Sequence, residues 1–443
     1  MDAEIEPYEP LNVVNFKSWL VEHGADIHSD AHFEQVVSGF SILAANDMPA
    51  DATVVSIPFS LAITPEGSKD ALQRTLEASG DATQGALDSL SERQLICTYL
   101  CMHWIADRSL TVLRHGPYLD TLPSPERLVT PLHFTSNELE AFRGSNLYGA
   151  TLDRQRDWEA EWVQCQAVVS AASPAWGEAF TWDRYLTAST YLSSRAFPST
   201  VLSQTPTLHT TPSSYPVLLP GIDALNHARA HPVSWVVSSS PDTPTSPSAE
   251  PSISLVIHTP TAAGSELLNN YGPKPNAELI LGYGFSLPNN PDDTIVLKIG
   301  GPSGASAPVP VDAKFEVGRH ARGAEPVWDA VLAAIGAQYG EDEEDGAMET
   351  DAETETVVED ELCAADMLAG MVQSLYDRLP PFPPTNVAEL RPQVVDMLEH
   401  YLEGQRDILR SLVAFAQEKE ARALQRAKEE GLDIVEEEDE MEE

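Results

Sequence analysis

Two strand-rich regions of the chain are separated by a long helical stretch, and this order limits the possible folds more than any other feature. Residues 33–64 show alternation and turn signals that are typical of short strands. The same character returns at residues 215–300, whereas residues 70–200 have mostly helical spacing, broken by prolines. We therefore expect an α+β fold in which a broken β-rich unit encloses a helical insert.

Helical periodicity defines the other elements. A first helix is expected at 12–28, with Gly24 as a plausible stop. Further helices are expected at 91–115, 136–144, 153–172, 181–195, 323–340, 363–379 and 388–430. The last of these carries one apolar stripe and has Pro392 in its first turn, where proline is tolerated. The region after residue 300 is therefore predicted to be all-helical.

These patterns divide the chain into five parts. The predicted limits are 1–69 and 201–300 for the two parts of the strand-rich unit, 70–200 for the insert, 301–430 for the helical region and 431–443 for an acidic tail. Residues 238–252, rich in serine and proline, resemble a disordered loop between two strands and not a domain boundary.

The chain is strongly acidic, with 26 Lys and Arg against 69 Asp and Glu and a net charge of −43. Residues 341–361 hold 12 acids and no base, and residues 429–443 hold 10 acids and no base, which is about half of the excess. Such segments are too polar to bury themselves and are predicted to be disordered. They either serve solubility, the more common role, or attract a basic protein partner. This charge is unsuited to direct binding of nucleic acid or of an anionic membrane surface.

The cysteines and the start of the chain point to a reducing compartment. Four cysteines, Cys97, Cys101, Cys165 and Cys363, are too few for a disulfide framework in a chain of 443 residues. The start, MDAEIEPYEP, has no apolar signal core, and no stretch approaches the roughly 20 apolar residues of a membrane span. We expect a soluble protein of the cytosol, the nucleus or both.

One group of residues could suggest a metal site. Cys97 and Cys101 form an i, i+4 pair on a predicted helix, with His103 nearby. No second ligand pair follows, so no metal is expected. The sequence also lacks a nucleophile elbow, a P-loop and a dinucleotide fingerprint.

Two segments place polar residues in apolar surroundings. They are 219–227, LPGIDALNH, and 264–285, GSELLNNYGPKPNAELILGYGF. A buried polar side chain that lacks a partner costs about 1–3 kcal/mol. Asp223, Asn226 and His227 therefore indicate either a polar ligand or an internal hydrogen-bond network, and spacing alone favours the network.

The same segments carry a family resemblance. Asp-x-x-Asn-His, then Gly-x-Glu-x-x-x-Asn-Tyr-Gly, Asn-x-Glu-Leu and Tyr-Gly-Phe resemble the SET-domain protein methyltransferases, most closely the branch typified by the Rubisco large-subunit lysine methyltransferase. The resemblance covers residues 12–300 well and 300–430 loosely. It implies a knotted SET fold interrupted by the insert, with a helical substrate-binding domain behind it.

The resemblance also assigns site residues. Those implied to bind the cofactor S-adenosylmethionine (AdoMet) are Gly39, Phe40, Arg195, Asp223, Asn226, His227 and Phe285. Arg195 matches the arginine that meets the methionine carboxylate, a pairing that guanidinium geometry suits. Asp223 is expected either to fix its turn or to meet the cofactor's amino group. Tyr271 falls on the catalytic tyrosine and Tyr283 on a second tyrosine of the lysine channel.

The early cofactor loop departs from the family pattern. The family usually has Gly-x-Gly, whereas this chain has Gly39-Phe40-Ser41. Gly39 can still bring its backbone close to a ligand, but Ser41 lacks the conformational freedom of glycine. We therefore expect a loop of altered shape, and cofactor affinity is the property that this departure affects.

The resemblance implies a protein-lysine N-methyltransferase. Its acidic charge suits a basic substrate, and relatives in the branch favour ribosomal proteins and translation factors over histones. One alternative is a SET-fold protein-histidine methyltransferase, because a member of this branch modifies a histidine in actin. Another is a non-catalytic acidic binding module. The sequence determines neither the target residue nor the number of methyl groups nor the oligomeric state.

Overall fold

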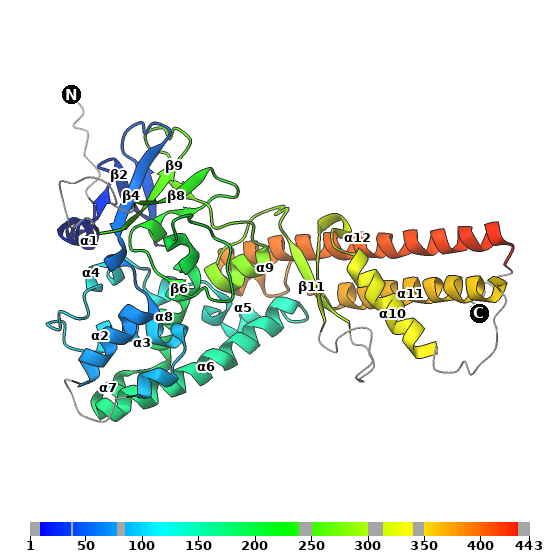
Figure 1. The fold of residues 1–443 in the computed structure, drawn as a ribbon, viewed down its shortest axis with the longest axis horizontal. Helices are drawn as coiled ribbons and strands as arrows, with labels where there is room; N and C mark the ends of the chain where they lie inside the picture. Colours follow the sequence, from blue (N-terminus) through cyan, green and yellow to red (C-terminus); the bar gives the residue numbers. More distant parts are fainter. Residues whose placement is uncertain are drawn as a thin grey trace. The chain divides into compact units, whose positions relative to one another are not determined.

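The computed structural model describes residues 9–36, 39–77, 85–238, 250–299, 313–339 and 350–432. It consists of two compact units, each with its own hydrophobic core (Figure 1). The first unit comprises Met1–His133, Ala150–Pro273 and Leu281–Gly284. The second comprises Phe134–Gly149, Lys274–Ile280 and Phe285–Glu443. This division differs from the predicted limit at residue 300, because Phe285 and the residues after it group with the C-terminal helices.

A four-stranded antiparallel sheet anchors the first unit (Figure 1). Its strands, in spatial order, are β1 (Asp26–Ile27), β4 (Ala52–Pro58), β9 (Ser252–Ile257) and β8 (Val233–Ser238). Ile57 pairs with Ile253, and both side chains are fully buried. Strands separated by almost 200 residues thus lie side by side, which confirms a β-rich unit completed across an insert.

Among its described residues, the first unit also contains three two-stranded sheets. They are β2 (Ala31–Val36) with β3 (Gly39–Ala44), β5 (Phe197–Pro198) with β6 (Pro216–Val217), and β7 (Asn226–His227) with β10 (Leu268–Asn269). The last pair is parallel, with Leu268 opposite Asn226. The Leu267 N–H also donates to the Ile42 carbonyl at 2.7 Å. The segment that ends in β10 therefore joins β3 to β7.

Helices make up the rest of the first unit. They are α1 (Leu11–Glu22), α2 (Pro65–Glu77), α3 (Glu92–Ile105), α4 (Gly116–Leu119), α6 (Asn146–Ala172, which begins in the second unit), α7 (Pro174–Ala179) and α8 (Trp182–Arg195). A capping box of Ser91 and Gln94 begins α3, and the Thr181 side chain caps α8. The prediction of a helix at 181–195 is confirmed within one residue.

Three predicted helices end several residues earlier than expected, and one of them, predicted at 136–144, ends at Glu140. The helix expected at 12–28 ends at Glu22, and Gly24 follows with φ of +81°, as its role of stop requires. The helix expected at 91–115 ends at Ile105, so the second half of that prediction is wrong. The Asp107 carboxylate accepts the Ser109 N–H at 2.8 Å, which stabilises a turn in place of a further helical turn.

The second unit combines a strand pair with long helices. Its elements are α5 (Ser136–Glu140), α9 (Asn276–Glu278), β11 (Thr294–Lys298), β12 (Lys314–Gly318), α10 (Glu325–Tyr339), α11 (Thr350–Arg378) and α12 (Pro392–Glu430). Because β12 pairs with β11, the region after residue 300 is not all-helical, contrary to the prediction. The antiparallel register runs over five residue pairs, from Thr294 with Gly318 to Lys298 with Lys314.

The acidic segment 341–361 is partly helical, which corrects the prediction of disorder. Residues 350–361 form the start of α11, and residues 341–349 lie outside the described residues. Val358 is 1% exposed, and Leu368 further along α11 is fully buried. Arg426 of α12 lies 3.1 Å from Glu361. The apolar stripe and this ion pair stabilise a helix that the count of acidic residues concealed.

The predicted loop 238–252 and the acidic tail fall mostly outside the description. Residues 239–249 and 433–443 are not described, whereas Ser238 and Ser252 end β8 and β9. Among the described helices, none has both the length and the apolar character needed to cross a bilayer.

Candidate active site

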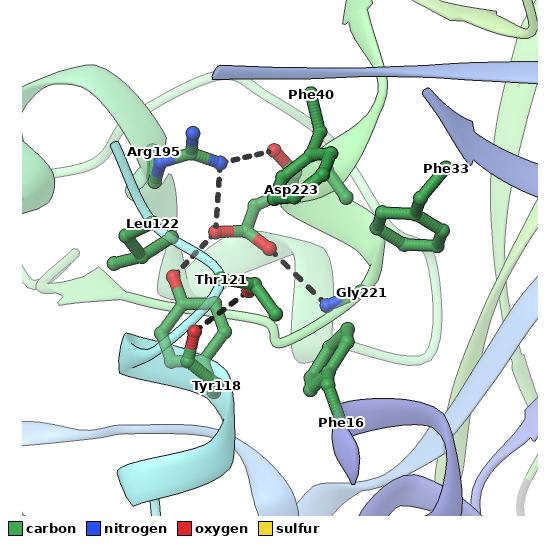
Figure 2. A pocket seen from close by; sticks show the side chains of 10 residues that line it. Phe16, Phe33, Phe40, Tyr118, Thr121, Leu122, Arg195, Gly221 and Asp223 are labelled. Atoms are coloured by element: carbon green, nitrogen blue, oxygen red, sulfur yellow. Dashed lines mark hydrogen bonds and ion pairs between the residues drawn. The ribbon is translucent and has the colours of Figure 1, made fainter. Parts of the chain in front are cut away.

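A cavity in the first unit contains three of the predicted site residues. It encloses about 310 Å³ of space, part of it open to solvent. Its lining residues are Phe16, Phe33, Phe40, Tyr118, Thr121, Leu122, Arg195, Gly221, Asp223 and Ala224. They come from α1, β2, β3, α4, the end of α8 and the turn Ile222–Ala224 (Figure 2).

An ion pair forms the polar side of this cavity (Figure 2). Nη1 of Arg195 donates to the Asp223 carbonyl oxygen at 3.0 Å and lies 3.6 Å from the Asp223 carboxylate. The same carboxylate accepts the Tyr118 hydroxyl at 2.5 Å and the Gly221 N–H at 3.2 Å. Its two oxygens are thus engaged within the protein, so Asp223 fixes the turn and positions Arg195. This agrees with the first of the two roles expected for Asp223.

Burial and charge act in opposite directions on this pair. Burial raises the pKa of Asp223, while Arg195 and the hydrogen bonds from Tyr118 and Gly221 lower it. Burial lowers the pKa of Arg195, but Asp223 and nearby phenols outweigh this effect and raise it. Arg195 is therefore a fixed cation. It uses Nη1 for both contacts, and within the described chain its other guanidinium nitrogens remain available to a ligand.

Aromatic rings form the apolar side of the cavity (Figure 2). The Phe33 and Phe40 rings meet edge to face with centroids 6.0 Å apart, and Phe16 packs against Phe33 at 6.2 Å. Phe40 thus lines the same cavity as Arg195 and Asp223. A guanidinium opposite an aromatic wall suits a ligand that combines a carboxylate with an apolar or planar part.

Asn226 and His227 lie in β7, next to β10. The Asn226 side-chain amide donates to the Glu266 carboxylate at 2.8 Å and to the Ser41 hydroxyl at 3.3 Å. Nδ1 of His227 accepts the Tyr271 N–H at 3.0 Å, so a neutral His227 carries its proton on Nε2. Asn226 and His227 are therefore part of an internal hydrogen-bond network.

His227, at the end of β7, is the first of three stacked aromatic rings. The His227 and Tyr271 rings stack with centroids 5.0 Å apart, and Tyr271 stacks on Tyr283 at 5.3 Å and 26°. The Tyr271 hydroxyl donates to the Leu225 carbonyl at 2.9 Å, which fixes its position. Burial raises the pKa of Tyr271. The charge of Arg195 lowers this pKa, and the charge of Asp223 raises it. The ring row therefore lies close to the ion pair, and its central phenol stays protonated at neutral pH.

Two glycines of the recognised motifs are required by their surroundings. Gly39 has φ of +137°, and a Cβ there would lie 3.0 Å from a side-chain carbon of Pro123. Gly284, between Tyr283 and Phe285, has φ of +79°, and a Cβ would lie 3.0 Å from the Val129 carbonyl carbon. Both positions disfavour other residues, because a positive φ and the close neighbour would strain a side chain.

Of the nine predicted site residues, Phe285 belongs to the second unit. Its expected place beside the cofactor therefore stays a prediction. Tyr118, Ser41 and Glu266 were missed as contact residues. Glu266 stands in the recognised Gly-x-Glu motif and could have been named, whereas nothing in the sequence around Tyr118 distinguishes it from a core aromatic.

Three of the four cysteines are buried, and Cys363 is exposed. Cys97 and Cys101 are fully buried in α3, and burial raises the pKa of both thiols. Such protonated thiols pack as small apolar groups. In the ranges that the structure describes, no group of three or more His, Cys, Asp or Glu side chains could hold a metal ion.

The architecture is that of a SET domain. The structure matches the crystal structure of the SET domain of LSMT bound to lysine and AdoHcy with a TM-score of 0.70, over 94% of this chain and 92% of that chain, at 16% identity. This likeness confirms the predicted α+β SET fold. No protein-family model matches the sequence.

The sequence is also similar to those of known methyltransferases. Ribosomal lysine N-methyltransferase set10 of Schizosaccharomyces pombe is 31% identical over 285 residues, which cover 63% of this chain and 46% of the relative. Actin-histidine N-methyltransferase of Gallus gallus is 23% identical over 290 residues, 64% of this chain and 44% of the relative. The chain thus spans slightly less than half the length of these relatives. The chain has the fold of a SET domain, and its sequence is similar to that of a ribosomal lysine N-methyltransferase.

Proposed function

We propose that the chain is an AdoMet-dependent protein-lysine N-methyltransferase that acts on a basic protein, with a ribosomal protein or a translation factor as the expected substrate. The observation that carries this proposal is the ring row of His227, Tyr271 and Tyr283 beside the Arg195–Asp223 pair. The similarity to a ribosomal lysine N-methyltransferase supports it.

The residues fit the amino-acid end of the cofactor. Arg195 has guanidinium nitrogens to spare for a carboxylate, and the Phe33 and Phe40 rings bound the same cavity. The cavity would take no more than this end of the molecule. Asn226 and His227 of β7 would hold the remainder. The bound cofactor would supply a methyl group on a positively charged sulfur.

The other site residues would orient a lysine amine. Transfer requires a neutral amine aligned with the methyl group at about 3–3.5 Å. Stacked Tyr271 and Tyr283 would form a wall along a straight aliphatic side chain, and the fixed Tyr271 hydroxyl would orient polarised C–H groups. Because burial raises its pKa, the Tyr271 phenol cannot be the base. The amine, with an ordinary pKa near 10.4, would lose its proton through desolvation beside a positive charge.

Histidine methylation is the second candidate, since an actin-histidine N-methyltransferase is among the relatives. That relative is 23% identical over its matched region, against 31% for the ribosomal lysine methyltransferase. We therefore favour lysine. The net charge of −43 agrees with a basic substrate, because opposite charges steer association. We also propose a cytoplasmic or nuclear location, where ribosomal proteins and translation factors are made and used.

The proposal is tested with the purified full chain, labelled AdoMet and ribosomal proteins, with the modified residue read by mass spectrometry. Methyl-lysine formation that Tyr271→Phe reduces at least roughly tenfold, with S-adenosylhomocysteine affinity retained, would support it. Tyr376→Phe is the control, because it removes a phenol hydroxyl on α11 of the second unit. Methylation of histidine alone would establish the second candidate. Absence of both S-adenosylhomocysteine binding and methylation would favour the non-catalytic binding module.

A further inference from the structure

A second cavity lies in the first unit, between α2, α3 and residues 111–115. It encloses about 860 Å³, including space open to solvent. Its lining residues are Ala62, Ile63, Thr64, Gly67, Ser68, Asp70, Ala71, Arg74, Tyr99, Thr111, Val112, Arg114 and His115. None of them lines the Arg195 cavity. An occupant of this cavity would therefore not be the proposed cofactor.

Ser68 presents a buried hydroxyl to this cavity. The residue is 2% exposed, and its Oγ has no hydrogen-bond partner among the described residues. Seven residues further along α2, the Thr75 hydroxyl donates to the Ala71 carbonyl at 2.8 Å. Ser68 makes no such bond to its own helix. Buried hydroxyls nearly always have a partner, so the partner of this one comes from outside the described chain, as an ordered water or as a ligand in the cavity.

Two exposed arginines give the cavity a local excess of positive charge. Arg74 and Arg114 both line it, and neither has a carboxylate of the described chain within 4.0 Å. Arg114 also donates to the Ser60 carbonyl, which holds its side chain in place. Asp70 is the one acidic side chain among the described lining residues. Two cations against one anion are notable in a chain of net charge −43.

Tyr99 and His115 form a part of the cavity lining that is fixed by hydrogen bonds and uncharged. Nδ1 of His115 lies 2.5 Å from the Tyr99 hydroxyl, and its Nε2 lies 3.2 Å from the Leu61 carbonyl. The Leu61 carbonyl can only accept, so Nε2 carries the proton and Nδ1 accepts from Tyr99. Burial lowers the pKa of His115, which keeps its ring neutral. Charge recognition in the cavity therefore depends on Arg74, Arg114 and Asp70.

We propose that this cavity binds a small organic anion, one that carries a carboxylate or phosphate group next to an apolar part. Arg74 and Arg114 bind the anionic group, and the Ser68 hydroxyl donates to it from the floor of the cavity. The aliphatic side chains of Ile63 and Val112 contact the apolar part. A long polyanion is excluded, because the negative charge of the rest of the chain repels it.

Calorimetric titration of the full chain at low ionic strength tests the site, with citrate and inorganic phosphate as probes for the two anionic groups. We expect saturable binding of at least one probe with a Kd of about 1 mM or below. Arg74→Gln is expected to weaken it roughly tenfold and Ser68→Ala at least threefold. Asp70→Asn is expected to tighten it, because it removes the opposing charge. Arg156→Gln is the control, since Arg156 is an exposed arginine of α6 that pairs with Asp153.

Several outcomes would overturn the proposal. The first is that neither probe binds saturably, and the second is that Arg74→Gln and Arg156→Gln weaken binding equally. The third is that Asp70→Asn weakens binding, because that result would indicate a zwitterionic or cationic ligand. Arg74→Lys keeps the charge and is expected to retain most of the affinity, which separates loss of the site from loss of the fold. S-adenosylhomocysteine affinity is expected to be unchanged in Arg74→Gln, so a failure here leaves the proposed function unaffected.

Discussion

The Ser41 hydroxyl lies 3.3 Å from the side-chain amide of Asn226 and accepts a hydrogen bond from it. Ser41 is the position at which this chain departs from the Gly-x-Gly pattern of the SET-domain family that its sequence resembles. The departure therefore supplies a contact to a predicted cofactor residue, besides restricting the loop. Glu266 provides the second contact to the same amide, at 2.8 Å.

Ser41→Gly is expected to weaken S-adenosylhomocysteine binding modestly. It removes one of two hydrogen bonds that orient Asn226, and such a bond is worth about 0.5–1.5 kcal/mol. This corresponds to a loss of roughly twofold to tenfold in affinity, measured by calorimetric titration. Glu266→Gln keeps an acceptor oxygen and is expected to lose less than Glu266→Ala. Tighter binding by Ser41→Gly would instead show that the serine acts mainly by distorting the loop.

Tyr118→Phe is expected to affect both stability and ligand affinity. It removes a 2.5 Å hydrogen bond to the Asp223 carboxylate, whose side chain is 1% exposed. A bond to a charged group contributes about 1.5–3 kcal/mol, and Arg195 loses part of its anchoring. We expect a lower midpoint in urea unfolding and weaker S-adenosylhomocysteine binding.

Tyr99→Phe is the matched control for this change. Tyr99 is equally buried, at 3% exposed, and its hydroxyl bonds to His115 away from the Arg195 cavity. Both variants are expected to lose stability, but only Tyr118→Phe to lose ligand affinity. Equal affinities in the two variants would show that Tyr118 does not contribute to ligand binding.

Gly284→Ala is expected to destabilise the first unit by about 1–3 kcal/mol, through a positive φ and contact with the Val129 backbone. Gly149→Ala is the control, because a Cβ there meets no atom within 4 Å and Gly149 lies inside α6. That change is expected to be neutral or stabilising by up to about 1 kcal/mol. The thermal unfolding midpoints of the two variants test this prediction. Equal midpoints would contradict the strain assigned to Gly284.

The sequence predicted much of the site because its polar residues lie in short motifs. Asp223, Asn226 and His227 fall within five consecutive residues, and β7 and β10 then bring Tyr271 to them. Tyr118 could not be found in this way, since it lies 105 residues before Asp223 in a helical insert without a motif. Contacts that depend on tertiary packing leave no local signal.

The same reasoning explains the errors in the fold prediction. Charge density predicted disorder at 350–361, but tertiary burial of Val358 in α11 outweighs it. The strand β12 was missed because it begins 16 residues after the end of its partner β11, in a region that was predicted to be all-helical. Helix α8 was predicted well, since its cap at Thr181 and its apolar face are both local features.

The stability of the second unit is expected to depend on pH through Asp293. Its side chain is 2% exposed, and its carboxylate accepts the Asn276 N–H at 2.7 Å and lies 3.3 Å from Arg319. Burial raises the pKa of Asp293 to about 6, although Asn276 and Arg319 act to lower it. The folded state therefore binds a proton more tightly than the unfolded state, whose carboxyl has a pKa near 3.9.

The sign of the effect follows from this difference. Between about pH 6 and pH 4 the folded chain holds one more proton at Asp293 than the unfolded chain, so the contribution of this residue to stability grows as pH falls. Asp293→Asn removes this dependence. We expect the stability of the wild type relative to Asp293→Asn to rise by about 1–3 kcal/mol from pH 7 to pH 4, read from urea unfolding at each pH. A difference that is constant with pH, or that shrinks towards pH 4, would show that Asp293 stays ionised in the folded state.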